Sequence, residues 1–418
     1  MIRRLITACF RLCVRIFFRR IELLGMERVP DGPVVFAVAH PNALIDPLFL
    51  LCFAPRPVSF LAKAPLLRYP VIGWLARAFD TIPVYRKQDN TTGSNEETFS
   101  RAREVLQRGG SIAIFPEGTT HDDPRLRELK TGAARIALGA DVPALTVVPT
   151  GIYYTDKHVF RSSALVLFGD PIVVQPLRVV QPLAVKGEPP AEDVEQLTGA
   201  IDAGLDTVTL QADSHAALAL IARAEDIFTG DDEQPLAEEF DLRRRFIEGY
   251  HYLSARDPKR LEQLQQKIAQ FESELRRAKL DVHELKPRVD ALRLFRVIVL
   301  LPLAIAGAVL HYPTYRLIGF LAKRLAKGER SVMATMKFLA ALLLYPLTYI
   351  AAAFFIGVYA LALPFLGYLA LVVFEEVDDV IGDLRAMRHR MFRTSGHAQL
   401  LAQREAILEE FLAVAKEL

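Results

Sequence analysis

One apolar run near the C-terminus constrains the fold of this chain more than any other feature. From Phe338 to Phe374, 37 consecutive residues include no Asp, Glu, Lys, Arg or His. A membrane-spanning helix needs about 20 apolar residues, and core helices of soluble proteins are rarely so long and uncharged. The run therefore predicts two closely spaced membrane passes or a re-entrant hairpin. Its expected turn or kink points are Pro346, Gly357, Pro364 and Gly367.

The surroundings of this run bear on how the chain sits in a membrane. An earlier apolar stretch, Val297 to Leu310, is long enough for a short span, a re-entrant piece or an interfacial helix, so the number of passes stays open. Basic residues flank the long run on both sides: Arg316, Lys323, Arg324, Lys327 and Arg330 before it, and Arg385, Arg388, Arg390 and Arg393 after it. The positive-inside rule places both flanks in the cytoplasm, so we expect an integral membrane protein with its soluble part on the cytoplasmic side.

The N-terminus predicts a second contact with the membrane. The first 20 residues contain six arginines and no acidic residue, interspersed with Leu, Ile, Phe and Val. This pattern predicts a basic amphipathic helix on an anionic membrane surface, which we assign to residues 1–27. Arg11 and Arg15 interrupt the apolar stretch that a cleaved signal peptide requires. An ordinary surface helix packed on its own domain is the alternative.

Charge and cysteine content argue against several classes of protein. The 51 Lys and Arg residues nearly balance 49 Asp and Glu residues, so the chain does not resemble a protein that binds nucleic acid across its surface. Its three cysteines (Cys9, Cys13 and Cys52) lack C-x-x-C spacing and predict neither a disulfide framework nor a thiolate metal cluster. The sequence also lacks the G-x-S-x-G elbow of a serine hydrolase or thioesterase.

Short β-rich runs alternate with helical stretches between residues 28 and 175. The runs cover residues 34–39, 58–62, 81–85, 111–115, 144–149 and 164–168. This alternation predicts an α/β domain in which helices cover both faces of a mixed, mostly parallel sheet. Ligands of such sheets bind at the carboxyl ends of the strands.

The remainder of the chain divides into three further segments. Residues 176–290 are expected to be helical, and a 3-4 spacing of apolar residues there predicts an amphipathic or coiled-coil-like helix packed on a neighbouring helix. The apolar positions are Leu261, Leu264, Ile268, Phe271 and Leu275. We expect a membrane-embedded region over 291–376 and a cytoplasmic helix over 377–418.

A histidine and an aspartate follow the first β-rich run of the α/β domain. His40 and Asp46 each precede a proline, which disfavours helical geometry, so Asp46 is expected to cap a helix that starts at Pro47. The intervening turn can bring the carboxylate to the imidazole, which would make His40 a base for a hydroxyl nucleophile. A helix cap and a strand-end histidine are also common structural features, so this pair alone leaves both interpretations open.

A second polar cluster follows the run at 111–115. It reads Phe-Pro-Glu-Gly-Thr-Thr-His over residues 115–121, and Arg125, Arg127 and Lys130 come after it. A tight turn with hydroxyls and nearby cations suits an anion such as a polyol phosphate, and a plain surface loop is the alternative. Arg86 adds an arginine, at the end of another β-rich run, that can bind phosphate through two hydrogen bonds.

Together and in this order, these pieces resemble the motifs of the glycerolipid acyltransferase superfamily, the glycerophosphate and lysophosphatidate acyltransferases. The usual first motif separates its His and Asp by four residues. Five residues separate His40 from Asp46, as in the H-x-N-x-x-x-D-P form of the yeast-type glycerol-3-phosphate/dihydroxyacetone-phosphate acyltransferases. The usual F-P-E-G-T-R-S motif has lost its arginine here, where Thr120 and His121 follow Thr119. The motifs cover roughly residues 30–175.

The resemblance implies acyl transfer from a fatty acyl thioester, either acyl-CoA or acyl-carrier protein, to the sn-1 hydroxyl of glycerol 3-phosphate. It implies no metal or other cofactor. His40 would be the general base, and Asp46 would orient it. The implied substrate-binding residues are Asn42, Arg86, Glu117, Gly118, Thr119 and Lys130, with Lys130 in place of the missing arginine.

Three alternatives stay open at the level of sequence. The acceptor can be dihydroxyacetone phosphate, or it can be lysophosphatidate, in which case the product is phosphatidate. A catalytically silent membrane scaffold with the same fold is the third alternative. The expected partners are the lipid membrane, the acyl thioester and a phosphorylated glycerol acceptor, and not nucleic acid.

Overall fold

The computed structural model describes residues 2–68, 70–85, 95–174, 189–230, 234–285, 290–392 and 394–418. The chain divides into two compact units. One comprises Met1–Gln211 together with Ala326–Met336, and the other comprises Ala212–Leu325 together with Lys337–Leu418. This division differs from the five expected segments, because residues 189–211 and 326–336 group with the α/β domain.

The described part of the first unit contains an eight-stranded sheet in the order β1-β7-β6-β2-β5-β3-β4, with β8 paired to β6. The strands are β1 (Arg20–Leu24), β2 (Val34–Val38), β3 (Val58–Lys63), β4 (Ile82–Val84), β5 (Ser111–Ile114), β6 (Thr146–Tyr154), β7 (Ser163–Phe168) and β8 (Ile172–Val173). Only the β6–β7 and β6–β8 pairs are antiparallel. The sheet is therefore mixed and mostly parallel, as predicted.

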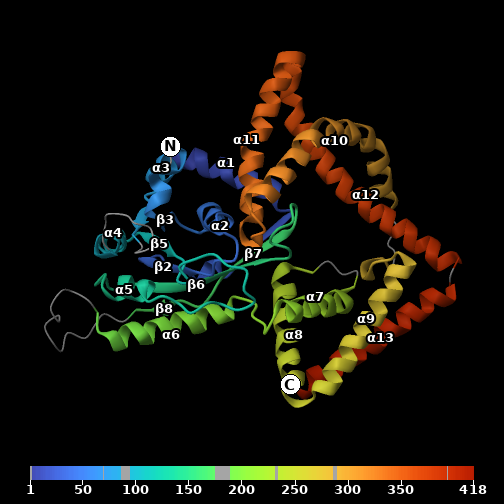
Figure 1. Cartoon of the computed structure of the whole chain (residues 1–418), viewed down its shortest axis with the longest axis horizontal. Coiled ribbons are helices and arrows are strands. Elements are labelled where there is room, and N and C mark those ends of the chain that lie inside the picture. The colour runs from blue at the N-terminus through green and yellow to red at the C-terminus, as the bar shows by residue number, and fades with distance from the viewer. Residues whose placement is uncertain are drawn as a thin grey trace. The chain divides into compact units, whose positions relative to one another are not determined.

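Helices cover both faces of this sheet. They are α1 (Ile2–Phe17), α2 (Ile45–Phe53), α3 (Pro70–Ala78), α4 (Asn95–Gln107), α5 (Gly132–Leu138) and α6 (Ala191–Thr207), with short 3-10 turns η1 (Met26–Arg28) and η2 (Ala64–Arg68). Figure 1 shows α1 and α2 on one side of the sheet and α5 and α6 on the other. All five residues of β2 are buried, which a central parallel strand covered on both faces requires.

The N-terminal helix is shorter than expected. It ends at Phe17, and Arg20–Leu24 forms strand β1 at the edge of the sheet, so residues 18–27 are not part of a surface helix. Val14 and Phe17 are buried against the domain, whereas Leu5 and Leu12 are exposed together with several arginines. The helix therefore packs on its own domain with one face and exposes a basic and apolar face.

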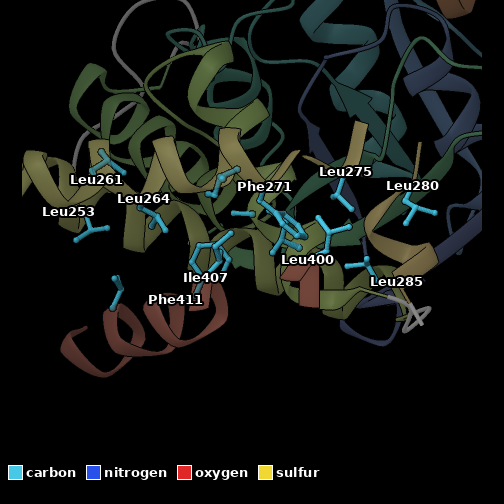
Figure 2. Packing of buried hydrophobic residues seen from close by; sticks show 14 of the residues in the cluster. Leu253, Leu261, Leu264, Phe271, Leu275, Leu280, Leu285, Leu400, Ile407 and Phe411 are labelled. Atoms are coloured by element: carbon cyan, nitrogen blue, oxygen red, sulfur yellow. The ribbon is translucent and has the colours of Figure 1, made fainter. Parts of the chain in front are cut away.

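The second unit contains a bundle of amphipathic helices. These are α7 (His215–Thr229), α8 (Leu236–Arg256), α9 (Pro258–Ala278) and α13 (Thr394–Glu417), with the 3-10 turn η4 (Val282–Leu285). The five apolar positions of the predicted helix lie on α9 and are all buried, in one core with Leu400, Ile407 and Phe411 of α13 (Figure 2). The prediction of a helix packed on a neighbour of the same chain is confirmed.

The apolar residues of this unit form three further helices. These are α10 (Ala291–Leu325), α11 (Arg330–Ile356) and α12 (Leu363–Phe392), and the 3-10 turn η5 (Gly357–Ala362) joins the last two. The predicted break in the long run is thus confirmed at Gly357. Pro346 lies inside α11, and Pro302 and Pro313 lie inside α10.

Helix α10 bends so that its two halves lie against different partners. In its first half Arg296 pairs with Glu376 of α12, and the backbone of Gly307 lies against that of Leu366. In its second half Thr314 hydrogen-bonds to Thr348 of α11, with 2.9 Å between the hydroxyl oxygens. Figure 1 shows α10 as an arch beneath the hairpin of α11 and α12. Both ends of the arch therefore lie at the open end of that hairpin.

Candidate active site

The structure brings the predicted catalytic pair together at the carboxyl end of β2. The Nδ1 atom of His40 lies 2.9 Å from Oδ2 of Asp46. The side chain of Asp46 is fully buried, and that of His40 is 16% exposed. Helix α2 begins at Ile45, with Leu44 as its N-cap, so the prediction that Asp46 caps the helix is wrong. The carboxylate instead points back to the preceding loop.

Three donors hold the carboxylate of Asp46. Besides the imidazole, the backbone N–H of Asn42 donates to Oδ2 at 2.7 Å and the hydroxyl of Tyr154 donates to Oδ1 at 2.6 Å. Burial and the neighbouring Asp46 raise the pKa of Tyr154 well above its ordinary value, so the phenol stays protonated. Because an ionised carboxylate only accepts, Nδ1 of His40 carries the proton and Nε2 holds the free electron pair.

The free nitrogen of His40 is available to a substrate. Among the residues that the structure describes, no group hydrogen-bonds to Nε2. The imidazole stacks on the ring of Phe115, with 4.1 Å between the ring centroids. The ring is thus fixed by Asp46 and Phe115, while its basic nitrogen is unoccupied.

Glu117 connects the second polar cluster to His40. Its side chain is buried; Oε1 accepts the backbone N–H of His40 at 2.8 Å, and Oε2 accepts the ring of His121 and the N–H of Arg127. Burial by itself would raise the pKa of Glu117, but His121 and the two backbone donors outweigh it and hold the pKa below its ordinary value. Both carboxylate oxygens therefore face donors of this chain.

Gly118 and Lys130 lie side by side at the same edge of the sheet. Gly118 has a φ of +71°, and a Cβ there would lie 2.7 Å from Cε of Lys130. The backbone N–H of Lys130 donates to the carbonyl of Pro116 at 2.8 Å, whereas its exposed ammonium has no ion-pair partner within the described ranges. The N–H of Gly118 donates to the carbonyl of Phe115, so it is not free for an oxyanion.

The other predicted substrate contacts differ in their surroundings. Asn42 is buried, and its amide nitrogen donates to the carbonyl of Lys157 at 3.1 Å. Thr119 is half-buried in the second polar cluster, and its hydroxyl oxygen lies 3.4 Å from the carbonyl oxygen of Thr120. Arg86 lies outside the described residues. Within those residues, no group of three or more His, Cys, Asp or Glu side chains is arranged to hold a metal ion.

Sequence reasoning missed Tyr154 as part of the site, and it placed Thr120 and His121 in the second polar cluster without predicting their contacts. Strand β6 pairs with β2 up to Val38 and Thr150 and continues to Tyr154, which carries the phenol past the end of β2. The hydroxyl of Thr120 donates to the carbonyl of His40 at 2.9 Å. A signal was present for Tyr154, because the apolar and aromatic pattern of the strand continues beyond Pro149.

Comparison with known families agrees with this geometry. The Acyltransferase family model matches residues 20–152, and the model of the glycerol-3-phosphate acyltransferase 2 C-terminal domain matches residues 227–418. Residues 20–152 thus match an acyltransferase domain, and residues 227–418 match the C-terminal domain of a glycerol-3-phosphate acyltransferase. The resemblance seen in the motifs, including that to the yeast-type branch, is thereby confirmed.

Individual members of the superfamily match different lengths of the chain. Glycerol-3-phosphate O-acyltransferase 1 of Saccharomyces cerevisiae is 27% identical over 80% of this chain and 58% of its own length. Glycerol-3-phosphate O-acyltransferase 2 of the same yeast is 28% identical over 61% of this chain and 37% of its own. The chloroplastic 1-acyl-sn-glycerol-3-phosphate acyltransferase LPAT1 of Arabidopsis thaliana is 30% identical, but over 32% of this chain and 37% of its own. The chain thus spans less than two thirds of the length of each of these three relatives.

The apolar helices of this chain suit a bilayer. Two helical segments, Ala291–Leu325 and Arg330–Phe392, are long and apolar enough to cross a membrane, and little of either is buried inside the protein. Large apolar side chains such as Phe354 and Phe355 are more than 80% exposed. Such a surface needs lipid around it, so this is a membrane protein.

Proposed function

We propose that this protein transfers an acyl group from a fatty acyl thioester to the sn-1 hydroxyl of glycerol 3-phosphate. The observation that carries the choice of acceptor is the match of residues 227–418 to the C-terminal domain named for glycerol-3-phosphate acyltransferase 2. The similarity to a yeast enzyme of the same acceptor, over 80% of the chain, supports it. The product, lysophosphatidate, would be the first intermediate of phospholipid synthesis.

The catalytic pair suits direct transfer without an acyl-enzyme. Nε2 of His40 takes the proton of the acceptor hydroxyl as its oxygen attacks the thioester carbonyl carbon. The resulting imidazolium is stabilised by Asp46, whose Oδ2 accepts a hydrogen bond from Nδ1–H with 2.9 Å between the two heavy atoms. As the tetrahedral intermediate collapses, the carbon–sulfur bond breaks and His40 returns the proton to the departing thiolate. The ester and the free thiol are the two products.

Lys130 supplies a cation for the phosphate of the acceptor. Its exposed ammonium projects from a segment that lies against the turn at Gly118, next to the strand end that carries His40. Arg86 is proposed as a second phosphate contact, and Asn42 and Thr119 as further acceptor contacts. Glu117 shapes the acceptor site by fixing the backbone of His40.

The first test measures which lipid the protein makes. Membranes that contain wild type or His40→Ala receive a labelled long-chain acyl group, bound to CoA or to acyl-carrier protein. The acceptor is either glycerol 3-phosphate or dihydroxyacetone phosphate. We expect labelled lysophosphatidate from glycerol 3-phosphate, and a rate about 10² to 10⁴ lower in the variant because it lacks the general base. His215→Ala, which changes a histidine at the start of α7, is the control. Equal rates in wild type and His40→Ala would contradict the mechanism.

Lysophosphatidate is the second candidate acceptor. Acyltransferases named for it match the catalytic domain but cover about a third of the chain, as in LPAT1. Phosphatidate formed only from added lysophosphatidate would move the assignment to this acceptor. No product from any acceptor, with either donor, would favour the non-catalytic scaffold.

The catalytic domain is proposed to face the cytoplasm. Supporting this side, basic residues such as Arg316, Lys323 and Arg324 gather near one end of α10, and the N-terminal helix exposes arginines. In sealed right-side-out vesicles, a membrane-impermeant maleimide should leave Glu329→Cys unmodified in a variant without native cysteines. Inside-out vesicles should allow modification; the reverse pattern would refute cytoplasmic placement.

A further inference from the structure

The segment that joins two apolar helices belongs to the catalytic unit. Residues Ala326–Met336, which include the first two turns of α11, group with the α/β domain and not with the helices on either side of them. Within this segment Ala334 is fully buried and Thr335 is 4% exposed. The start of α11 is therefore packed into the domain that carries His40.

Thr335 contacts the loop between the two catalytic residues. The backbone N–H of Leu44 donates to Oγ1 of Thr335 at 3.1 Å. The two preceding N–H groups are also held by side chains: that of Asn42 by Asp46 at 2.7 Å, and that of Ala43 by Thr120 at 2.9 Å. Three successive loop amides are thus held by side chains of α2, of the second polar cluster and of α11.

The loop needs this support because one of its residues adopts an unfavourable conformation. Ala43 has a φ of +31°, in the region that residues with a Cβ rarely occupy. Such conformations persist only where neighbouring contacts hold them. The amides on either side of this residue donate to Asp46 and to Thr335. Losing either contact allows the strained loop to relax.

We propose that Thr335 is a positioning residue of the active site, which holds the His40–Asp46 loop in its productive geometry by accepting the N–H of Leu44. The inference rests on the proposed acyl transfer. It gives the C-terminal half of the chain a part in the reaction, because the base of an apolar helix then completes the support of the catalytic loop. Thr335 does not touch the substrate and acts through the loop alone.

A second threonine on the same helix provides a matched control. The hydroxyl of Thr348 donates to the carbonyl of Leu344 and pairs with Thr314 of α10, within the other unit. Replacing it by valine removes a hydroxyl from α11 without touching the catalytic loop. Thr348→Val therefore reports the general cost of such a change in the helix.

The test compares kcat and KM of Thr335→Val, Thr335→Ser and Thr348→Val. Valine keeps the shape of threonine but cannot accept the amide, so kcat should fall about 10-fold to 100-fold as His40 loses its alignment. The KM values for glycerol 3-phosphate and acyl-CoA should stay within about twofold, because no substrate contact is lost. Serine keeps the oxygen and should restore most of kcat, and Thr348→Val should behave as wild type. A normal kcat in Thr335→Val, or an equal loss in Thr348→Val, would overturn the proposal.

Hydrogen exchange tests the contact without reference to activity. In the purified protein, the amide of Leu44 should exchange faster in Thr335→Val than in wild type or Thr335→Ser, since its acceptor is gone. Unchanged exchange at Leu44 would overturn the inference even if the wild type proved inactive toward every acceptor. If Leu44 exchanges faster in Thr335→Val but the wild type is inactive toward every acceptor, the contact stands and only the proposed function is contradicted.

Discussion

The hydroxyl of Tyr154 donates to Oδ1 of Asp46 at 2.6 Å, while Oδ2 of the same carboxylate lies 2.9 Å from His40. The imidazole of His40 is thus held by a carboxylate, and Tyr154 holds that carboxylate from the other side. Tyr154 is 9% exposed, so water does not readily replace its hydroxyl. The arrangement fixes the carboxylate plane and, through it, the direction of the imidazole.

Tyr154→Phe should lower kcat and leave the KM values almost unchanged. A hydrogen bond to a charged group contributes about 1.5 to 3 kcal/mol, so we expect a loss of roughly 10-fold to 100-fold if most of it acts in the transition state. Steady-state kinetics with both substrates measures the effect. Tyr153→Phe, which changes the neighbour on the opposite face of the strand, is the control, and an equal loss there would mean that the strand itself is damaged.

Glu117→Gln should destabilise the protein at neutral pH and less so in acid. The pKa of Glu117 lies below its ordinary value in the folded protein, so folding favours the ionised form. That stabilisation is complete above about pH 4.3, the pKa of an unfolded glutamate, and is lost as the pH falls through the lower folded pKa. The Tm difference between wild type and variant should therefore shrink below about pH 4.3.

The control for this measurement lies in the same loop. Glu128 is exposed, and Glu128→Gln should leave the Tm unchanged across the pH range. A Tm difference for Glu117→Gln that stays constant down to pH 3.5 would mean that the charge of Glu117 does not stabilise the fold.

Most of the α/β domain follows from local sequence patterns. All six β-rich runs form strands, because short apolar segments bounded by polar turns favour buried strands. Strand β1 was missed because its sequence, RIELL, continues the basic and apolar pattern of the preceding helix. Its partner β7 begins more than 140 residues later, so only the tertiary fold reveals the pairing. Strand β8 has two residues, too few for any pattern.

The candidate site could be predicted in part for the same reason. His40, Asp46 and Glu117 follow strands, and parallel neighbours β2 and β5 bring their carboxyl ends to one edge of the sheet. Tyr154 and Thr335 come 108 and 291 positions after the groups that they bind. No local period or spacing encodes such contacts, which depend on how the whole domain packs.

Lys130→Ala should raise the KM for glycerol 3-phosphate about 10-fold, because the loss of one phosphate contact costs about 1.4 kcal/mol or more. Its kcat should stay within about threefold, since the phosphate is distant from the reacting hydroxyl. Lys130→Arg should retain a low KM. Assays with glycerol as a phosphate-free acceptor complete the test: an equal effect on glycerol would contradict a phosphate contact. The exposed Lys416 supplies the control Lys416→Ala.

The turn between α11 and α12 should lie inside the hydrocarbon core. Its residues, Gly357–Ala362, carry no charge, and Tyr359 is 78% exposed. From Tyr359 to the first charged residue of α12, Glu375, a helix extends about 24 Å, which is less than the roughly 30 Å thickness of the core. We therefore expect the hairpin and the arch of α10 to enter and leave the bilayer on the same side.

A single tryptophan makes this depth measurable. Trp74 is the one tryptophan of the sequence, so Trp74→Phe combined with Tyr359→Trp places one fluorophore at the turn. Lipids brominated near the chain ends should quench it more strongly than lipids brominated near the headgroup. Phe392→Trp in the same background lies beyond the acidic residues of α12 and should escape quenching by chain-brominated lipids. Quenching of position 359 by iodide, trapped inside or added outside the vesicles, would show that the turn reaches water. The two helices would then make two full passes and not a re-entrant hairpin.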